Sequence, residues 1–192
     1  MSWFEEIIRS LSATGQLLRH DREGLSGFNN TASGFWRSFS AIILIAPLYV
    51  FIASVNWNPD STGAATAASS NGDGFSPGLS LISLSLQWAL WPLAMAFASR
   101  WLGLGQHFSR YVIVYNWSNV AIITVLAIPT VLFKAGMFSL EAAMLFTAIL
   151  QLFSIYFEWY LARLTLATNG LIAAAVVLGN FVLSAGILRI TG

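Results

Sequence analysis

The sequence predicts an all-α membrane protein, a bundle of five transmembrane helices preceded by an amphipathic N-terminal helix. The chain is 57% hydrophobic and only 9% charged, with a mean hydropathy of +0.71, whereas soluble domains carry about a quarter charged residues. Apolar runs near the length of about 20 residues that spans a bilayer recur along the chain. They lie at about 38–55, 79–102, 111–133, 142–162 and 171–188.

Composition also excludes several classes of function. The length of 192 residues fits one membrane domain, and the net charge of +1 gives no basic surface for nucleic acid. The chain contains no cysteine, which excludes disulfides, thiolate metal sites and a cysteine nucleophile.

Residues 1–34 are predicted to form a cytoplasmic amphipathic helix and a connector, ahead of a transmembrane domain at 35–192. Ser2 followed by Glu5 is a capping-box pattern, and the first long apolar run begins only near Ser38, too late for a signal peptide. Acidic and basic side chains nearly balance in this segment, so docking onto the protein's own helices or onto a partner is as reasonable as lipid binding. The predicted docking face, at helical spacing, is Phe4, Ile7, Ile8, Leu11 and Leu18.

The first three spans are punctuated by prolines and polar loops. The span at 38–55 holds Pro47, which should kink it, and the polar segment 56–78 is predicted to be a surface loop. The second span, 79–102, is followed by a short turn at 103–110. The third, 111–133, should bend at Pro129.

The fourth span, 142–162, carries a polar stripe. Its polar side chains follow one another at +4, +3 and +4, so they share one face of a helix that is otherwise apolar. Such a face should turn toward other helices or a wet cavity. The stripe consists of Thr147, Gln151, Ser154 and Glu158.

Orientation follows from the distribution of Lys and Arg. With the N-terminus in the cytoplasm, seven of the nine basic residues fall inside, and Lys134 and Arg189 fall outside. The positive-inside rule therefore predicts a cytoplasmic N-terminus and a periplasmic C-terminus.

That orientation places four polar side chains at one depth near the cytoplasmic side: Arg100, Asn116, Asn119 and Glu158. They could form a polar pocket or an ion relay. Alternatively Glu158 and Arg100 neutralise each other while the asparagines bond between helices, an interpretation we favour because charges near the interface cost less than central ones. In that case Glu158 faces the bundle and pairs with Arg100, with Asn116 or Asn119 as a further partner.

No catalytic or metal-binding set is recognisable. His20 and His107, the two histidines of the chain, stand outside any HExxH pattern, and GxSxG, P-loop and GxGxxG motifs are missing. We therefore predict no catalytic residues, no metal site and no cofactor.

The topology and two short segments carry a family resemblance. Residues 111–118 (YVIVYNWS), with Pro129 downstream, look like the third-span pattern of bacterial Yip1-like proteins. Residues 34–39 (GFWRSF) look like a segment of uncharacterised inner-membrane proteins of alphaproteobacteria. The resemblance to the Yip1 superfamily implies a bacterial inner-membrane protein without known catalysis, and it assigns no functional residue.

Two hypotheses of function follow. The first is a non-enzymatic inner-membrane protein that acts through a protein partner or as a homo-oligomer, as scaffold, assembly factor or accessory subunit. The second is a permease or channel for a small solute or ion that uses the polar stripe. A water-filled cavity that reaches Gln151 would favour transport, and a closed bundle with an exposed apolar groove would favour partner binding.

Overall fold

The computed structural model describes residues 2–56 and 75–191, and over these residues the protein is all-α. Most of the predicted surface loop at 56–78 lies outside the described residues. Five helical segments are long and apolar enough to cross a membrane, which confirms the predicted fold class. The elements are α1 (Trp3–Leu18), η1 (Arg22–Gly27), α2 (Ala32–Ser38), α3 (Ala41–Asn56), α4 (Pro77–Trp101), α5 (Gly105–Lys134), α6 (Leu140–Thr165) and α7 (Gly170–Thr191).

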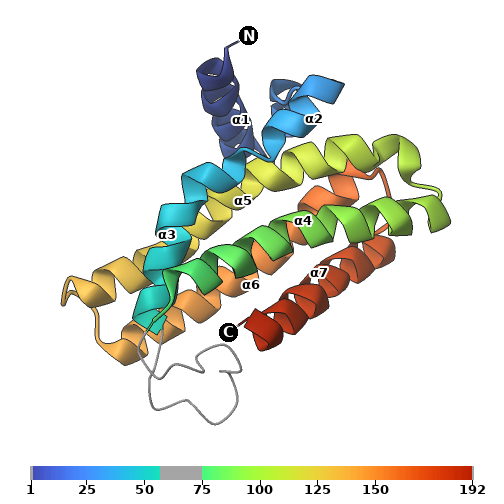
Figure 1. Cartoon of the computed structure of the whole chain (residues 1–192). Coiled ribbons are helices and arrows are strands. Elements are labelled where there is room, and N and C mark those ends of the chain that lie inside the picture. The colour runs from blue at the N-terminus through green and yellow to red at the C-terminus, as the bar shows by residue number, and fades with distance from the viewer. Residues whose placement is uncertain (1, 57–74, 192) are drawn as a thin grey trace.

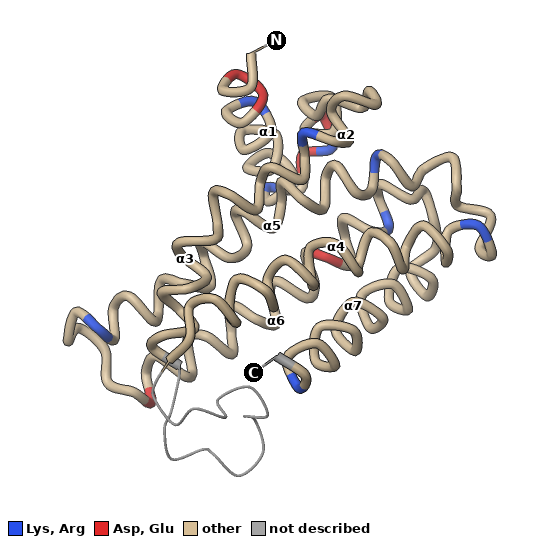
Figure 2. Tube along the Cα trace, in the orientation of Figure 1, with Lys and Arg blue, Asp and Glu red and all other residues tan. Residues whose placement is uncertain are grey.

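The long helices run side by side, and α5 lies at their centre (Figure 1). α5 packs against α3, α4 and α6 and also against α1 and α2. It begins in a continuously buried stretch in which Val112, Ile113 and Val114 are all 0% exposed. Lys and Arg lie mainly near helix ends and in the N-terminal segments, and the long helices are largely free of charge along their length (Figure 2).

The N-terminal helix begins as the sequence predicts. Ser2 Oγ accepts from the Glu5 backbone N–H at 3.2 Å, and Glu5 Oε2 accepts from the Ser2 backbone N–H at 2.9 Å, so the capping box is complete. η1 then folds back on α1 at very close range. A Cβ added to Gly24 would lie 2.7 Å from the Ala13 carbonyl oxygen, and one added to Gly27 would lie 2.6 Å from Ala13 Cβ.

The docking face of α1 is rotated from the predicted one. Ile7 is buried and Leu11 and Leu18 are partly buried, but Phe4 and Ile8 are 66% and 55% exposed. Small residues contribute to the true face, because Ala13 lets Gly24 and Gly27 of η1 approach the helix closely, and a hydrophobic pattern does not reveal this. The buried residues of α1 are Glu6, Ile7, Ser10, Ala13, Thr14 and Leu17.

Polar contacts also hold α1 to the rest of the chain. The Glu6 carboxylate, 1% exposed, pairs with Arg37 of α2 at 3.1 Å. At the other end of the helix, His20 Nε2 lies 2.9 Å from the Tyr156 hydroxyl of α6. The N-terminal segment is therefore packed on the bundle at both ends of α1.

Two boundaries differ from the prediction. The turn expected at 103–110 is shorter, because α5 already begins at Gly105; Gly103, with φ of +69°, supplies the reversal. The first predicted span, 38–55, corresponds to α3 from Ala41, and α2, which ends at Ser38, extends it on the N-terminal side to give the candidate span Ala32–Val55. Ser40 Oγ donates to the Arg37 carbonyl at 2.6 Å in the break between them.

Candidate intramembrane polar site

An asparagine side chain joins a tyrosine and a glutamate from two other helices. Asn180 of α7 donates from Nδ2 to Glu158 Oε2 of α6 at 3.1 Å. Its Oδ1 accepts from the Tyr115 hydroxyl of α5 at 3.3 Å. The amide thus uses both of its ends, and the three side chains fix α5, α6 and α7 relative to one another.

A second contact extends this polar site to α4. Trp91 Nε1 donates to the Tyr111 hydroxyl at 2.9 Å, and the Tyr111 ring stacks on the Tyr115 ring with centroids 5.7 Å apart. Tyr111 and Tyr115 are one helical turn apart on α5, so one face of α5 carries both phenols. We call Trp91, Tyr111, Tyr115, Glu158 and Asn180 the polar site.

The predicted ion pair between Glu158 and Arg100 does not form. Glu158 bonds Asn180, whereas Arg100 is exposed in the last turn of α4 and makes no ion pair with any described residue. A residue at a helix end can extend its cation away from the bundle into water, so a similar depth does not by itself bring the two side chains together.

The two predicted asparagines have different neighbours, since Asn116 contacts α2 whereas Asn119 lies beside Tyr115 of the polar site. Asn116 is fully buried and donates from Nδ2 to Ser38 Oγ of α2 at 2.9 Å. Asn119 is 8% exposed, about one turn further along the helix. Asn116 therefore helps to hold the N-terminal segment, and the four predicted cluster residues do not form one site.

The four residues of the polar stripe of α6 also have different partners and do not form one site. Thr147 and Ser154 donate to the carbonyls of Ala143 and Leu150, one turn earlier in their own helix. Glu158 contributes to the polar site. Gln151 is exposed on the surface of the bundle and hydrogen-bonds none of the residues in 2–56 and 75–191.

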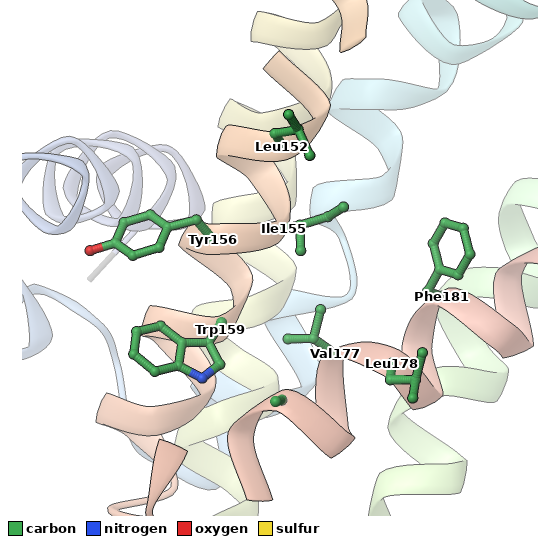
Figure 3. Close-up of a pocket in the computed structure, with 8 residues that line it drawn as sticks. Leu152, Ile155, Tyr156, Trp159, Val177, Leu178 and Phe181 are labelled. Carbon is green, nitrogen blue, oxygen red and sulfur yellow. The ribbon is translucent and has the colours of Figure 1, made fainter. Parts of the chain in front are cut away.

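An apolar groove of about 460 Å³ lies between α6 and α7, and no residue of the polar site lines it. Figure 3 shows side chains of α6, among them Tyr156 and Trp159, on one side of it, and Leu178 and Phe181 of α7 on the other. Trp159 Nε1 donates to the Gly170 carbonyl at 2.9 Å and so links the two helices near their connection. The lining residues are Leu152, Ile155, Tyr156, Trp159, Ala174, Val177, Leu178 and Phe181.

Sequence reasoning proposed Glu158 as a site residue but missed the other members of the polar site, Trp91, Tyr111, Tyr115 and Asn180. For Asn180 a signal exists. The connection between α6 and α7 is short, so the two helices are antiparallel neighbours. Glu158 lies seven residues before Thr165 and Asn180 lies ten residues after Gly170. The difference of three residues is about 4.5 Å along the helices, within reach of the two side chains.

The chemistry available at the polar site is hydrogen bonding and proton exchange by one carboxyl and two phenols. The described residues contain no group of three or more His, Cys, Asp and Glu side chains that could hold a metal ion. The fold and this site define a multi-pass helical membrane protein. Comparison of the chain with family models, curated proteins and solved structures finds no match.

Proposed function

We propose that this chain is a non-enzymatic protein of a bacterial inner membrane that acts by binding another membrane-embedded protein, as a scaffold, assembly factor or accessory subunit. The N-terminus is cytoplasmic and the C-terminus periplasmic in this proposal. The excess of Lys and Arg on one side of the predicted spans supports that orientation.

Gln151 is the observation that carries the proposal. It lies near the middle of α6, eleven residues or about 16 Å from Leu140, and so near the centre of a bilayer. A primary amide exposed to hydrocarbon without a hydrogen-bond partner is costly. Transmembrane helices relieve this cost by bonding polar side chains across helix interfaces.

The surroundings of Gln151 suit a helix–helix contact. Ala148 and Met144 precede it at −3 and −7, both are exposed, and they lie on the same side of α6. The small side chain of Ala148 lets another helix approach closely next to the amide. We call Met144, Ala148 and Gln151 the Gln151 face.

The absence of cysteine from the chain makes a clean test possible. A single cysteine at Ala148, oxidised in native membranes, should give a disulfide-linked dimer if the partner is a second copy. If the partner is another protein, affinity purification in mild detergent should retain it, and Gln151→Leu should release it. Phe97 of α4 is also exposed and serves as the control for both the cysteine and the substitution. No dimer at residue 148, together with unchanged retained proteins in Gln151→Leu, would contradict the proposal.

The second candidate is a permease for protons or small ions, and the polar site is the observation that favours it. Glu158 is a carboxyl group in a candidate span that forms no ion pair with the described residues, and intramembrane acids mark ion pathways in many transporters. In liposomes that contain the purified protein, a proton or cation flux that disappears in Glu158→Gln would favour this function. We expect no such flux.

A further inference from the structure

We propose that an anionic glycerophospholipid binds along α6, with an acyl chain in the groove between α6 and α7 and its phosphate at Arg22 and Arg163. This inference is independent of the Gln151 face and of any protein partner. It rests on two cavities whose linings have complementary chemistry and that are linked by the contact of Arg163 with Trp159.

The first cavity is the apolar groove already described. It is lined on α6 by residues at spacings of three and four, so it follows one face of that helix. Its lining contains no acidic or basic side chain. A groove of this kind on the surface of a membrane bundle is filled by lipid chains or by another apolar surface.

The second cavity, of about 300 Å³, lies further along α6, toward its C-terminal end. It is lined by Tyr160, Arg163, Leu164 and Ala167 of the same stretch of chain, together with Thr168 and Arg22. From Leu152 of the groove to Leu164 of the second cavity, α6 rises about 18 Å over twelve residues. The length suits a headgroup and much of an acyl chain.

The positive charge of the second cavity favours an anionic lipid headgroup. The second cavity presents two guanidinium groups and no acid, and neither arginine forms an ion pair within the described part of the chain. Arg163 Cζ lies 5.5 Å from the centroid of the Trp159 ring, so this cation lies over a residue that also lines the apolar groove. Guanidinium groups recognise phosphate through paired hydrogen bonds.

The site also joins the N-terminal segment to the bundle. Arg22 belongs to η1 and Arg163 to α6, and His20, just before η1, lies against Tyr160 with ring centroids 4.8 Å apart. A phosphate between the two arginines would therefore bridge η1 and α6. Lipid binding should protect the N-terminal segment from proteolysis.

Native mass spectrometry of the full-length protein in mild detergent tests the proposal. Dioleoyl phosphatidylglycerol should bind more tightly than dioleoyl phosphatidylcholine, by roughly fivefold for each arginine. Arg22→Gln with Arg163→Gln should abolish this preference and should also speed proteolysis of residues 1–24. Arg110→Gln, an exposed arginine outside both cavities, should change neither result.

The groove is tested separately by filling it. Ala174→Phe should weaken both lipids, whereas Ala175→Phe, on an exposed residue outside the groove lining, should not. Glycerol 3-phosphate should fail to displace phosphatidylglycerol, because it has no acyl chain. Equal binding of the two lipids by the wild type, an equal effect of Arg110→Gln, displacement by glycerol 3-phosphate, or a second copy of the chain in the groove would each overturn the proposal.

Discussion

Removing the Asn180 side chain should destabilise the bundle by about 1–2 kcal/mol. Asn180 is 9% exposed, and Asn180→Leu keeps the number and branching of the side-chain heavy atoms, so little packing is lost. The substitution leaves Glu158 without its amide donor and Tyr115 without its acceptor. Hydrogen bonds to charged groups contribute about 1.5–3 kcal/mol in proteins generally. Bonds between transmembrane helices average about 0.6 kcal/mol, with a maximum near 1.7 kcal/mol.

A double-mutant cycle isolates the contact between Asn180 and Glu158. Glu158→Gln alone should cost less than Asn180→Leu, because an amide oxygen still accepts from Asn180. The double variant should be more stable than the sum of the two losses predicts, by about 1 kcal/mol, because no carboxyl group is then left without its donor. The assay is thermal unfolding in detergent, where about 1 kcal/mol corresponds to roughly 2–4 °C for a chain of this size.

Arg100→Leu is the matched control for that cycle. Arg100 is exposed and unpaired within the described residues, so its removal should change the free energy of unfolding by less than about 0.5 kcal/mol. Strong coupling of Glu158 to Arg100, or none to Asn180, would refute the hydrogen-bond assignment.

Three further predictions concern the N-terminal segment and are measured by limited proteolysis of residues 1–24 with unfolding in detergent. Leu17→Ala, at a residue that is 0% exposed, should cost about 2–5 kcal/mol and release α1. Ile8→Asp, at a residue that is 55% exposed, should leave α1 docked, and release in this variant would show that the helix packs by the face the sequence predicts. Gly24→Ala should loosen η1, because its Cβ would meet the Ala13 carbonyl oxygen; unchanged protease protection would show that this approach is not tight.

The sequence predicts the elements of this fold better than their contacts. Apolar runs of sufficient length located all five long helices, and the Ser2–Glu5 pattern located the start of α1, because both signals are local in the chain. The start of α5 was misplaced, since residues 105–110 are polar enough to suggest a turn although they continue a helix beyond the apolar span.

Contacts between helices depend on rotation and tilt, which a local pattern does not specify. The polar site is one example. Depth counted along each span predicted that Glu158 pairs with Arg100, whereas in the structure Glu158 accepts from Asn180. The packing of α1 is a second example. The helix turns Ala13 toward Gly24 and Gly27 of η1, and larger apolar side chains of the predicted face stay exposed. Gln151 shares its stripe with Ser154, yet Ser154 is buried and Gln151 is exposed.

Photo-crosslinking from residue 151 in native membranes tests the central proposal most directly. A photoreactive phenylalanine analogue at Gln151, compared with one at Phe97, places the same reactive group on two exposed surfaces of the bundle. We predict a discrete protein adduct from position 151 that is weak or missing from position 97, because the Gln151 face binds another transmembrane helix. Adducts with lipid alone at position 151, or the same protein adducts from both positions, would contradict the account.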